Sequence, residues 1–386
     1  MVVAEKNGVL DIFCGAGGLS LGFLIEGFDI VYSSDNNSRA IKTISFNHNK
    51  IHLSRGEKNY HFTDTEDINN LNARKVRKIF RERGYRVQGI IGGPPCQGFS
   101  VANKQTRTID NPNNSLFRQY LRLIKELNPD FIVFENVVGF LSMANGKLKE
   151  EILTILDESG FLAECSVLNA SWYGVPQIRQ RVFIIGIKRN KLKKEYKEKL
   201  VFPAAKTRDC LVTVKEAFSG LPKIGMGEKR ETQKYLDLRS ISKYVKALRS
   251  STEFKMTAKN VFNHITTQNN ALVQERYRHI KQGENWHNLP EYLMDNYKDK
   301  TRCHSYIYRR LEEDKPSITV SDYRKCMFIH PTENRGLSVR EAARLQSFPD
   351  WYEFKGELGY KQQQVACAVP PLMAQAIAKE IKRMLK

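Results

Sequence analysis

The chain has 386 residues, with 62 Lys and Arg against 42 Asp and Glu, which gives a formal net charge of +20. Hydrophobic residues make up 41%, a composition that excludes a disordered or fibrous chain and suits two domains, or one large domain with an insertion. The N-terminus lacks a signal-peptide pattern and no run approaches the roughly 20 apolar residues of a membrane span, so we expect a cytoplasmic protein without a membrane partner.

The first half of the chain predicts strands that alternate with helices. Apolar runs indicate strands at 9–13, 29–35, 89–93, 131–136, 163–169 and 181–186, and helical spacing indicates helices at 19–25, 38–46, 116–127 and 147–159. This alternation is typical of an α/β fold with a parallel sheet covered on both faces.

The regular pattern breaks after the last of these strands. From Lys188 to about Tyr308 the sequence is polar, aromatic and irregular. A helix is predicted again at 338–346, with Ser338 as its cap and Glu341 at the capping-box position. Residues 365–381 predict a strand or turn followed by a closing amphipathic helix.

The positive charge is concentrated in this irregular part. Between Lys188 and Lys325 there are 31 Lys and Arg against 17 Asp and Glu, a net of +14. Such a region could contact phosphates. The alternative is a lysine-rich surface that faces solvent, and this alternative applies mainly to the run 191–199.

A glycine-rich turn follows the first predicted strand. The stretch Asp11 to Gly18 places glycines where the backbone can approach a ligand between a strand and a helix. Asp35 ends the next strand, in position to accept hydrogen bonds from ribose hydroxyls. The alternative is a dinucleotide site for hydride transfer, but Ser20 stands where the third glycine of that fingerprint belongs.

Cys96 is the candidate nucleophile. The seven cysteines form no CxxC pair, so no metal site is expected. Cys96 follows the Pro94-Pro95 turn at a strand end, which favours a reactive thiol over an inert filler. The polar stretch 101–114 predicts a lid over the site.

Two further polar groups could converge there. Glu135 and Asn136 end an apolar strand, where a carboxyl group can keep its proton and act as an acid. Gln177, Arg179 and Arg181 are expected to share one face of a strand. For Glu135, the alternative is a carboxylate paired with Lys or Arg. For Arg179 and Arg181, the alternative is an interdomain salt bridge.

Six motifs in order resemble the bacterial DNA (cytosine-5)-methyltransferases of restriction-modification systems. They cover both ends of the chain, and are residues 11–18, 92–100, 134–137, 177–181, 340–349 and 369–371. The resemblance implies a Rossmann-like S-adenosylmethionine-dependent methyltransferase domain, at 1–188 with 356–386. A smaller, irregular target-recognition domain with its hinge would then span 189–355, with the variable region at about 188–308.

The resemblance also implies the reaction. S-adenosyl-L-methionine would be the methyl donor, S-adenosyl-L-homocysteine its product, and a cytosine flipped out of double-stranded DNA the acceptor. Cys96 would attack C6 of the ring, Glu135 would hold the N3 edge and donate a proton, and Arg181 with Arg179 behind it would bind the O2 side and orient Glu135.

The same resemblance implies a set of cofactor residues, which surround the methionine, ribose and adenine groups: Phe13, Gly15, Gly17, Gly18, Asp35, Asn36, Asp67, Ile68, Pro94 and Leu116, with Ser115 nearby. One departure is that Ala366-Cys367 replace the family's usual Gly-Asn, which puts cofactor affinity in doubt. We expect a monomer whose partner is a cognate restriction endonuclease. The alternatives are a tRNA-directed relative and a DNA-binding relative without catalysis.

Overall fold

The computed structural model describes residues 5–57, 61–95, 116–206, 210–297 and 305–386. Its contacts divide the chain into two compact units. The sheet unit comprises Met1–Asn169, Gln180–Ala205 and Pro371–Lys386, and the irregular unit comprises Ala170–Arg179 and Lys206–Pro370. The sheet unit therefore runs to residue 205 and resumes at 371, whereas the predicted catalytic domain ends at 188 and resumes at 356.

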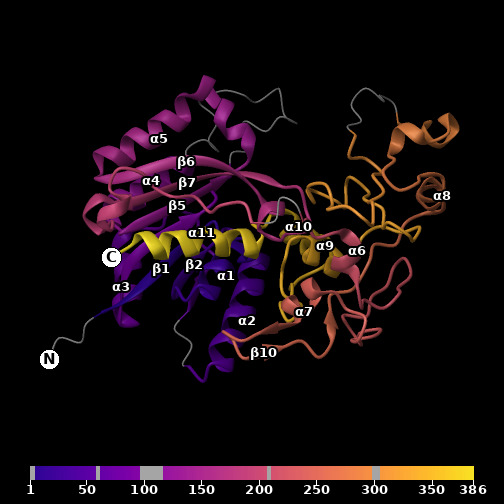
Figure 1. Cartoon of the computed structure of the whole chain (residues 1–386), viewed down its shortest axis with the longest axis horizontal. Helices are drawn as coiled ribbons and strands as arrows, with labels where there is room; N and C mark the ends of the chain where they lie inside the picture. The colour runs from indigo at the N-terminus through magenta and orange to yellow at the C-terminus, as the bar shows by residue number, and fades with distance from the viewer. Residues whose placement is uncertain (1–4, 58–60, 96–115, 207–209, 298–304) are drawn as a thin grey trace. The chain divides into compact units, whose positions relative to one another are not determined.

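The sheet unit is built on a seven-stranded sheet with the order β3-β2-β1-β4-β5-β7-β6 (Figure 1). Its strands are β1 Lys6–Ile12, β2 Ile30–Ser34, β3 Phe62–Asp64, β4 Tyr85–Gly92, β5 Phe131–Asn136, β6 Phe161–Asn169 and β7 Gln180–Lys188. All the strands predicted from apolar runs are present. The sequence did not indicate β3, because three residues are too few to show a period.

The predicted parallel pairing holds for β1 to β5, but β7 is antiparallel to both of its neighbours. A parallel neighbour requires a crossover of about a dozen residues or more, usually with a helix. Between β6 and β7 the chain has only residues 170–179, with one short 3-10 turn at Ala170–Tyr173. The chain therefore reverses direction here, so the predicted α/β sheet is parallel except at β7, which the sequence did not indicate.

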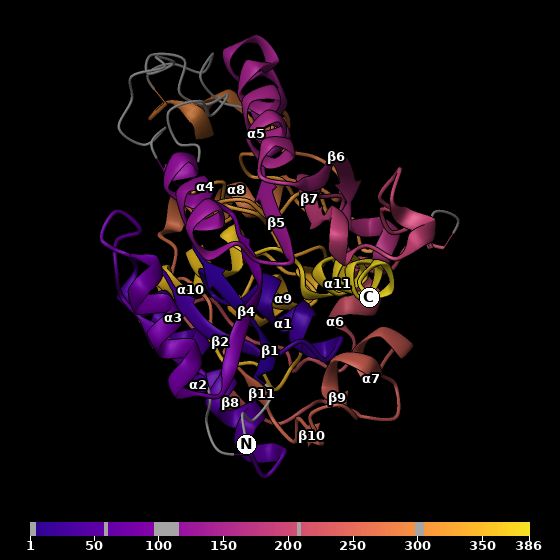
Figure 2. The ribbon, with the colours of Figure 1, turned by 90° about the vertical axis from the view of Figure 1, so that its left-hand side faces the viewer.

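Helices cover both faces of this sheet. On one face lie α3 Ala73–Glu82, α4 Leu116–Leu127 and α5 Lys147–Glu158, which bury apolar side chains of the central strands (Figure 2). On the other, α1 Gly18–Ile25 lies beside α11 Pro371–Met384. These two helices touch at Gly22, where an added Cβ would lie 2.5 Å from the Ala374 Cβ. The remaining helix, α2 Ser38–Ser54, follows β2 and is longer than predicted.

The irregular unit contains short helices and two small sheets. The helices are α6 Val214–Phe218, α7 Lys243–Arg249, α8 Ala271–His279, α9 Val339–Leu345 and α10 Leu358–Cys367. The sheets pair β8 Thr232–Gln233 with β11 Val261–Phe262, and β9 Ser250–Ser251 with β10 Met256–Thr257. The predicted closing helix is confirmed as α11, whereas Val365, expected in a strand or turn, lies in α10.

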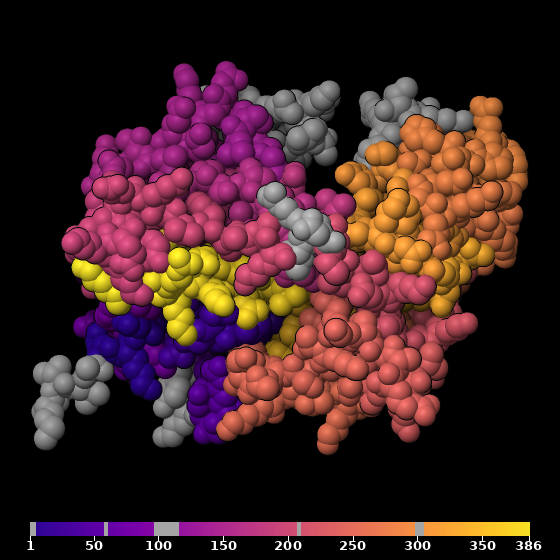
Figure 3. Space-filling view, in the orientation of Figure 1, coloured from indigo at the N-terminus to yellow at the C-terminus, as the bar shows by residue number. Residues whose placement is uncertain are grey.

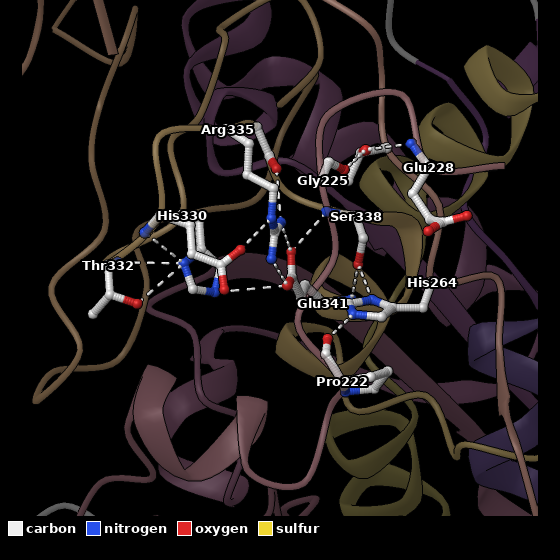
Figure 4. Close-up of polar contacts among 12 residues, drawn as sticks. Pro222, Gly225, Glu228, His264, His330, Thr332, Arg335, Ser338 and Glu341 are labelled. Carbon is white, nitrogen blue, oxygen red and sulfur yellow. Dashed lines mark hydrogen bonds and ion pairs between the residues drawn. The ribbon is translucent and has the colours of Figure 1, made fainter. Parts of the chain in front are cut away.

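The predicted capping box at the start of α9 is confirmed and belongs to a buried polar network (Figure 4). The Ser338 hydroxyl accepts the Glu341 N–H at 3.0 Å, and Glu341 Oε2 accepts the Ser338 N–H at 2.7 Å. Both Glu341 oxygens also accept Arg335 Nη groups, at 2.6 and 2.8 Å. Burial raises the pKa of Glu341, but Arg335 and His330 outweigh burial and hold it well below its usual value.

Within the described ranges, no helix is both long and apolar enough to cross a membrane.

Candidate active site

The register of the sheet brings five strand ends to one edge. Ile12 of β1 pairs with Ser34 of β2 and Gly92 of β4, Ser34 pairs with Asp64, and Gly92 pairs with Phe134. Ligands of open α/β sheets bind at this carboxyl edge, where the strand order reverses, here between β1 and β4. Most of the predicted site residues lie at these strand ends or shortly after them: Phe13, Gly15, Gly17, Gly18, Asp35, Asn36, Asp67, Ile68, Pro94 and Glu135.

The glycine turn between β1 and α1 has the backbone shape of a ligand cradle. Gly15 has φ 51° and Gly17 φ 77°, which glycine adopts without strain, and an added Cβ at Gly15 would enter open space. Phe13 also has a positive φ of 57°, a strained conformation for a bulky residue. Strain of this kind persists where the surrounding fold imposes it, as at ligand sites.

Asp35 is held rigidly beside this turn. Its Oδ2 accepts the Gly15 N–H at 2.9 Å and its Oδ1 accepts the Asn37 N–H at 2.8 Å. Burial raises the pKa of Asp35, and these two backbone hydrogen bonds offset part of the rise. Each carboxylate oxygen keeps acceptor capacity for a second donor, such as a ribose hydroxyl.

Asp11 is a buried carboxyl group at the same turn that was not among the predicted contact residues. It is fully buried, and neither oxygen has a hydrogen-bond partner among the described residues. Burial raises the pKa of Asp11 to about 8, with the Ser20 hydroxyl lowering it and Asp35 raising it further. The only sequence signal was its place in the Asp11–Gly18 motif.

The remaining predicted cofactor residues differ in solvent exposure. Asn36 and Asp67 are exposed, and Asp67 Oδ1 accepts the Asn69 N–H at 2.9 Å. Ile68 is buried, and Leu116 begins α4 and packs against the core. These positions leave the Asn36 and Asp67 side chains accessible from solvent.

Glu135 and Arg181 form an ion pair at the end of β5. Arg181 Nε lies 3.1 Å from Glu135 Oε1, and both side chains are mostly buried. The register explains the contact: Glu135 pairs with Phe183, so Arg181 stands two residues along β7 on the same face. Gly93 lies against this pair, because an added Cβ there would come within 2.6 Å of Glu135 Oε2.

Asn136 fixes the turn that leads to Cys96. Its Nδ2 donates to the Pro94 carbonyl at 3.0 Å, and its Oδ1 accepts the Val137 N–H at 2.9 Å. The end of β5 is thereby linked to the Pro-Pro turn after β4. Gly93 and Asn136 lie in the motifs 92–100 and 134–137, but the sequence did not indicate a role for either residue.

Cys96, Ser115 and the predicted lid at 101–114 lie outside the described residues. Three of the cysteines that the structure describes are disfavoured as nucleophiles. Burial raises the pKa of the Cys14, Cys165 and Cys326 thiols, which disfavours the reactive thiolate. Cys210 and Cys367 are exposed.

Strand β7 begins at Gln180, so Gln177 and Arg179 precede the strand and Arg181 lies in it. Gln177 and Arg179 are buried and Arg181 is half-buried, whereas Ile178 and Gln180 are exposed, so the predicted alternation continues across the start of β7. The buried Arg179 guanidinium belongs to the irregular unit, where it donates to the carbonyls of Val320, Ala366 and Ala368 at 3.0–3.1 Å.

Ala366 and Cys367, which replace the usual Gly-Asn, end helix α10. The Ala366 carbonyl accepts Arg179 Nη2 at 3.0 Å, and the Cys367 side chain is exposed. Arg179 therefore contacts this segment through the backbone carbonyls of Ala366 and Ala368, which do not depend on the side chains at 366 and 367.

A family model described as C-5 cytosine-specific DNA methylase matches residues 8–383. The chain belongs to this family. S-adenosyl-L-methionine is the family's methyl donor, and the chain is a DNA cytosine-5 methyltransferase of an α/β fold. The glycine cradle and the anchored Asp35 suit a ligand with a ribose.

Similar proteins include type II methyltransferases of bacteria. M.DdeI of Desulfomicrobium norvegicum is 34% identical over 97% of this chain and 88% of its own length. M1.HphI of Haemophilus parahaemolyticus is 33% identical over 97% of this chain and 86% of its own length. Among solved structures, a DNA modification methyltransferase encoded within an E. coli prophage has a TM-score of 0.76 and 27% identity, and covers 98% of this chain and 99% of its own.

Proposed function

We propose that this methyltransferase modifies C5 of a cytosine within a specific duplex sequence, through a covalent adduct between Cys96 and C6 of the ring. The supporting observation is the Glu135–Arg181 pair, which adjoins Gly93 at the strand end that continues into Pro94, Pro95 and Cys96. An acid, a cation and a thiol at one strand edge are the groups that this chemistry requires.

Cys96 as a thiolate forms the bond to C6, and the ring electrons move toward C5. Glu135, oriented by Arg181, donates a proton to N3 as negative charge develops on the ring, and this proton returns from N3 to Glu135 when the aromatic ring is restored. The bound cofactor supplies the methyl group to C5. A base or water then removes the C5 proton, and the returning electrons expel the Cys96 thiolate.

A thiol in a pocket cannot reach C6 inside a duplex, so the target base is flipped out. Arg181 binds the O2 side of that base while it orients Glu135. We assign the cofactor to Phe13, the glycines, Pro94 and Leu116 at the methionine and adenosine, Asp35 at the ribose, and Asp67–Ile68 at the adenine.

Arg179 serves as a positioning residue in this proposal, because its donors are occupied by backbone carbonyls of the irregular unit. The irregular unit reads the target sequence. The enzyme acts as a monomer and protects host DNA from a paired endonuclease.

The test is to express the wild type and Cys96→Ser in cells without cytosine methylation, and to sequence the DNA after bisulfite treatment. We expect one short sequence to be protected in wild-type cells and none with Cys96→Ser. Protection by Cys96→Ser, or no protected sequence with the wild type, contradicts the proposal. Methylated tRNA with unmethylated DNA would favour the tRNA-directed alternative, and no methylation of either would favour the inactive relative.

A further inference from the structure

The positive charge of the irregular unit is concentrated at one end of it. Residues 206–269 contain 13 Lys and Arg against 6 Asp and Glu, a net of +7, whereas residues 270–325 contain 11 against 9, a net of +2. Within this unit, α7 and β10 lie away from α8 in both views (Figures 1 and 2). The basic excess therefore belongs to the α7 end and not to the α8 end.

Six exposed cations form what we call the α7 face. They come from the loop before α7, from α7 itself and from the β9–β10 hairpin with the residues after it: Lys234, Arg239, Lys243, Lys246, Lys255 and Lys259. The segment 229–260 has 9 Lys and Arg against 3 Asp and Glu. In Figure 3 its salmon surface is on the outside of the unit.

Packing between these three segments fixes the α7 face. The Arg249 guanidinium lies over the Tyr235 ring at 4.7 Å, and its Nη2 donates to the Ala258 carbonyl at 3.1 Å. The inner side of α7 buries Tyr244, Val245 and Leu248. Lys243 and Lys246, three residues apart, therefore point outward together.

The lysines of the α7 face lack acidic partners, in the part of the chain that the structure describes. Of the three acids in the segment, Asp237 pairs with Arg239 at 3.2 Å, Glu231 pairs with Lys361, and Glu253 accepts the Ser251 hydroxyl. Five exposed ammonium groups without counter-charges have a strong attraction for a polyanion.

We infer that the α7 face binds the DNA backbone without sequence preference, as a contact additional to the recognised site. Lysine suits phosphate as a flexible point charge, and such contacts supply the non-specific affinity that lets a protein search along DNA. A protein partner is less well supported. Among the described residues of this segment, two large apolar side chains are exposed, Leu236 and Leu238, and two are too few for an extended apolar patch. A second copy of the chain is disfavoured by its net charge of +20.

The test uses a duplex made only of A·T pairs, which contains no cytosine. Its binding to the wild type and two variants is measured across about 50 to 200 mM salt. The α7 variant is Lys234→Gln/Lys243→Gln/Lys246→Gln. The matched control is Lys194→Gln/Lys197→Gln/Lys199→Gln, whose three lysines are exposed in the sheet unit. We expect the α7 variant to bind at least about tenfold more weakly at the higher salt, with a salt slope smaller by about 2 to 3. The control stays within about twofold of the wild type.

Equal losses in the two variants would overturn the inference, because net charge alone would then explain them. No loss in the α7 variant would also overturn it and leave the face to a protein partner. Lys255→Gln/Lys259→Gln gives a second, independent measure. The inference rests on DNA as the substrate, so methyl transfer at saturating plasmid DNA is measured in parallel. Normal turnover and an unchanged salt slope in the α7 variant would reject the α7 face alone. Absent turnover in the wild type would reject the proposed function.

Discussion

The two units use buried charge in opposite ways. In the sheet unit, β-strands satisfy the backbone, and polar side chains such as Asp35, Glu135 and Arg181 lie at strand ends where a ligand can meet them. In the irregular unit, arginine side chains bond the backbone itself. Arg340 donates to the carbonyls of Phe262, Pro349 and Tyr352, and Arg344 to those of Ala217 and Ser219.

Arg310 shows the same behaviour most fully. Its guanidinium donates to four carbonyls, at Tyr277, Ile280, His330 and Glu333, and to the Asn334 side chain. Buried carbonyls must be hydrogen-bonded, and a segment with few strands needs side chains to do it. Buried arginines of the irregular unit therefore hold its backbone in place, whereas Glu135 and Arg181 lie at a strand end of the sheet unit.

The largest expected effect of this difference is on stability, at Arg344. Its guanidinium donates from Nε and Nη2 to the two Asp350 oxygens, at 2.9 and 2.8 Å, and both side chains are fully buried. Arg344→Leu leaves the Asp350 carboxylate buried without its partner and should lower the free energy of unfolding by about 3–5 kcal/mol. Urea unfolding measures this loss.

The control is Arg239→Leu, which removes an exposed pair with Asp237 and should cost at most about 1 kcal/mol. The double variant Arg344→Leu/Asp350→Leu should recover part of the loss. Equal costs for Arg344→Leu and Arg239→Leu would contradict an architectural role.

The next effect is on catalysis, at Glu135. Glu135→Gln keeps the size of the side chain but removes the group that takes up and passes on a proton, so kcat should fall by about 10²- to 10⁴-fold. The free energy of unfolding should change less than in Arg344→Leu, because the amide oxygen can still accept the Arg181 Nε. Single-turnover methyl transfer measures the rate, with Asp157→Asn as a control at an exposed pair with Arg189. A normal rate for Glu135→Gln would remove it from the mechanism.

A smaller effect concerns acid stability of the sheet unit. The His48 ring lies 4.2 Å from the His61 ring, and its nitrogens have no hydrogen-bond partner among the described residues. Burial lowers the pKa of His48 to about 3, with His52 lowering it further. The unfolded chain takes up this proton near pH 6.5 and the folded chain does not, so stability is full above about pH 6.5 and declines as the pH falls toward 3, by about 1.4 kcal/mol per unit.

Replacing His48→Phe should flatten this decline, whereas His287→Gln at an exposed site should leave it unchanged. In the irregular unit, His264 and His330 also have lowered pKa values through burial, but the Glu341 carboxylate offsets part of that cost. Hydrogen exchange at pH 5 should therefore open α2 before α9. The reverse order would place the acid-sensitive group in the irregular unit.

The smallest effect is expected at Cys367. Since Arg179 contacts this segment through carbonyls, Cys367→Asn should change the KM for S-adenosyl-L-methionine by less than about threefold, which is under 1 kcal/mol. Asp35→Asn is the contrasting variant, because it weakens an acceptor for the ribose and should raise the KM by about tenfold or more. A large gain in affinity from Cys367→Asn would show that the missing side chain matters.

The same contrast explains what the sequence could predict. The central strands of the sheet unit correspond to short continuous apolar runs, so the sequence alone could assign Asp35, Glu135 and the residues around Cys96 to strand ends. The carbonyl acceptors of Arg179, at Val320, Ala366 and Ala368, could not be predicted, because they lie far along the chain and are backbone atoms. The two carbonyl acceptors of Arg344, at Ala217 and Ser219, lie 127 and 125 residues away along the chain and are backbone atoms, which carry no sequence signal.

The proposed mechanism requires a covalent bond between Cys96 and the target cytosine. The most direct measurement is the intact mass of the protein after incubation with S-adenosyl-L-methionine and a duplex that carries 5-fluorocytosine at the mapped position, where the fluorine blocks release of the enzyme. We expect the wild type and Cys14→Ser to gain the mass of a DNA strand and Cys96→Ser to gain none. No adduct with the wild type, or normal methylation by Cys96→Ser, would contradict the account.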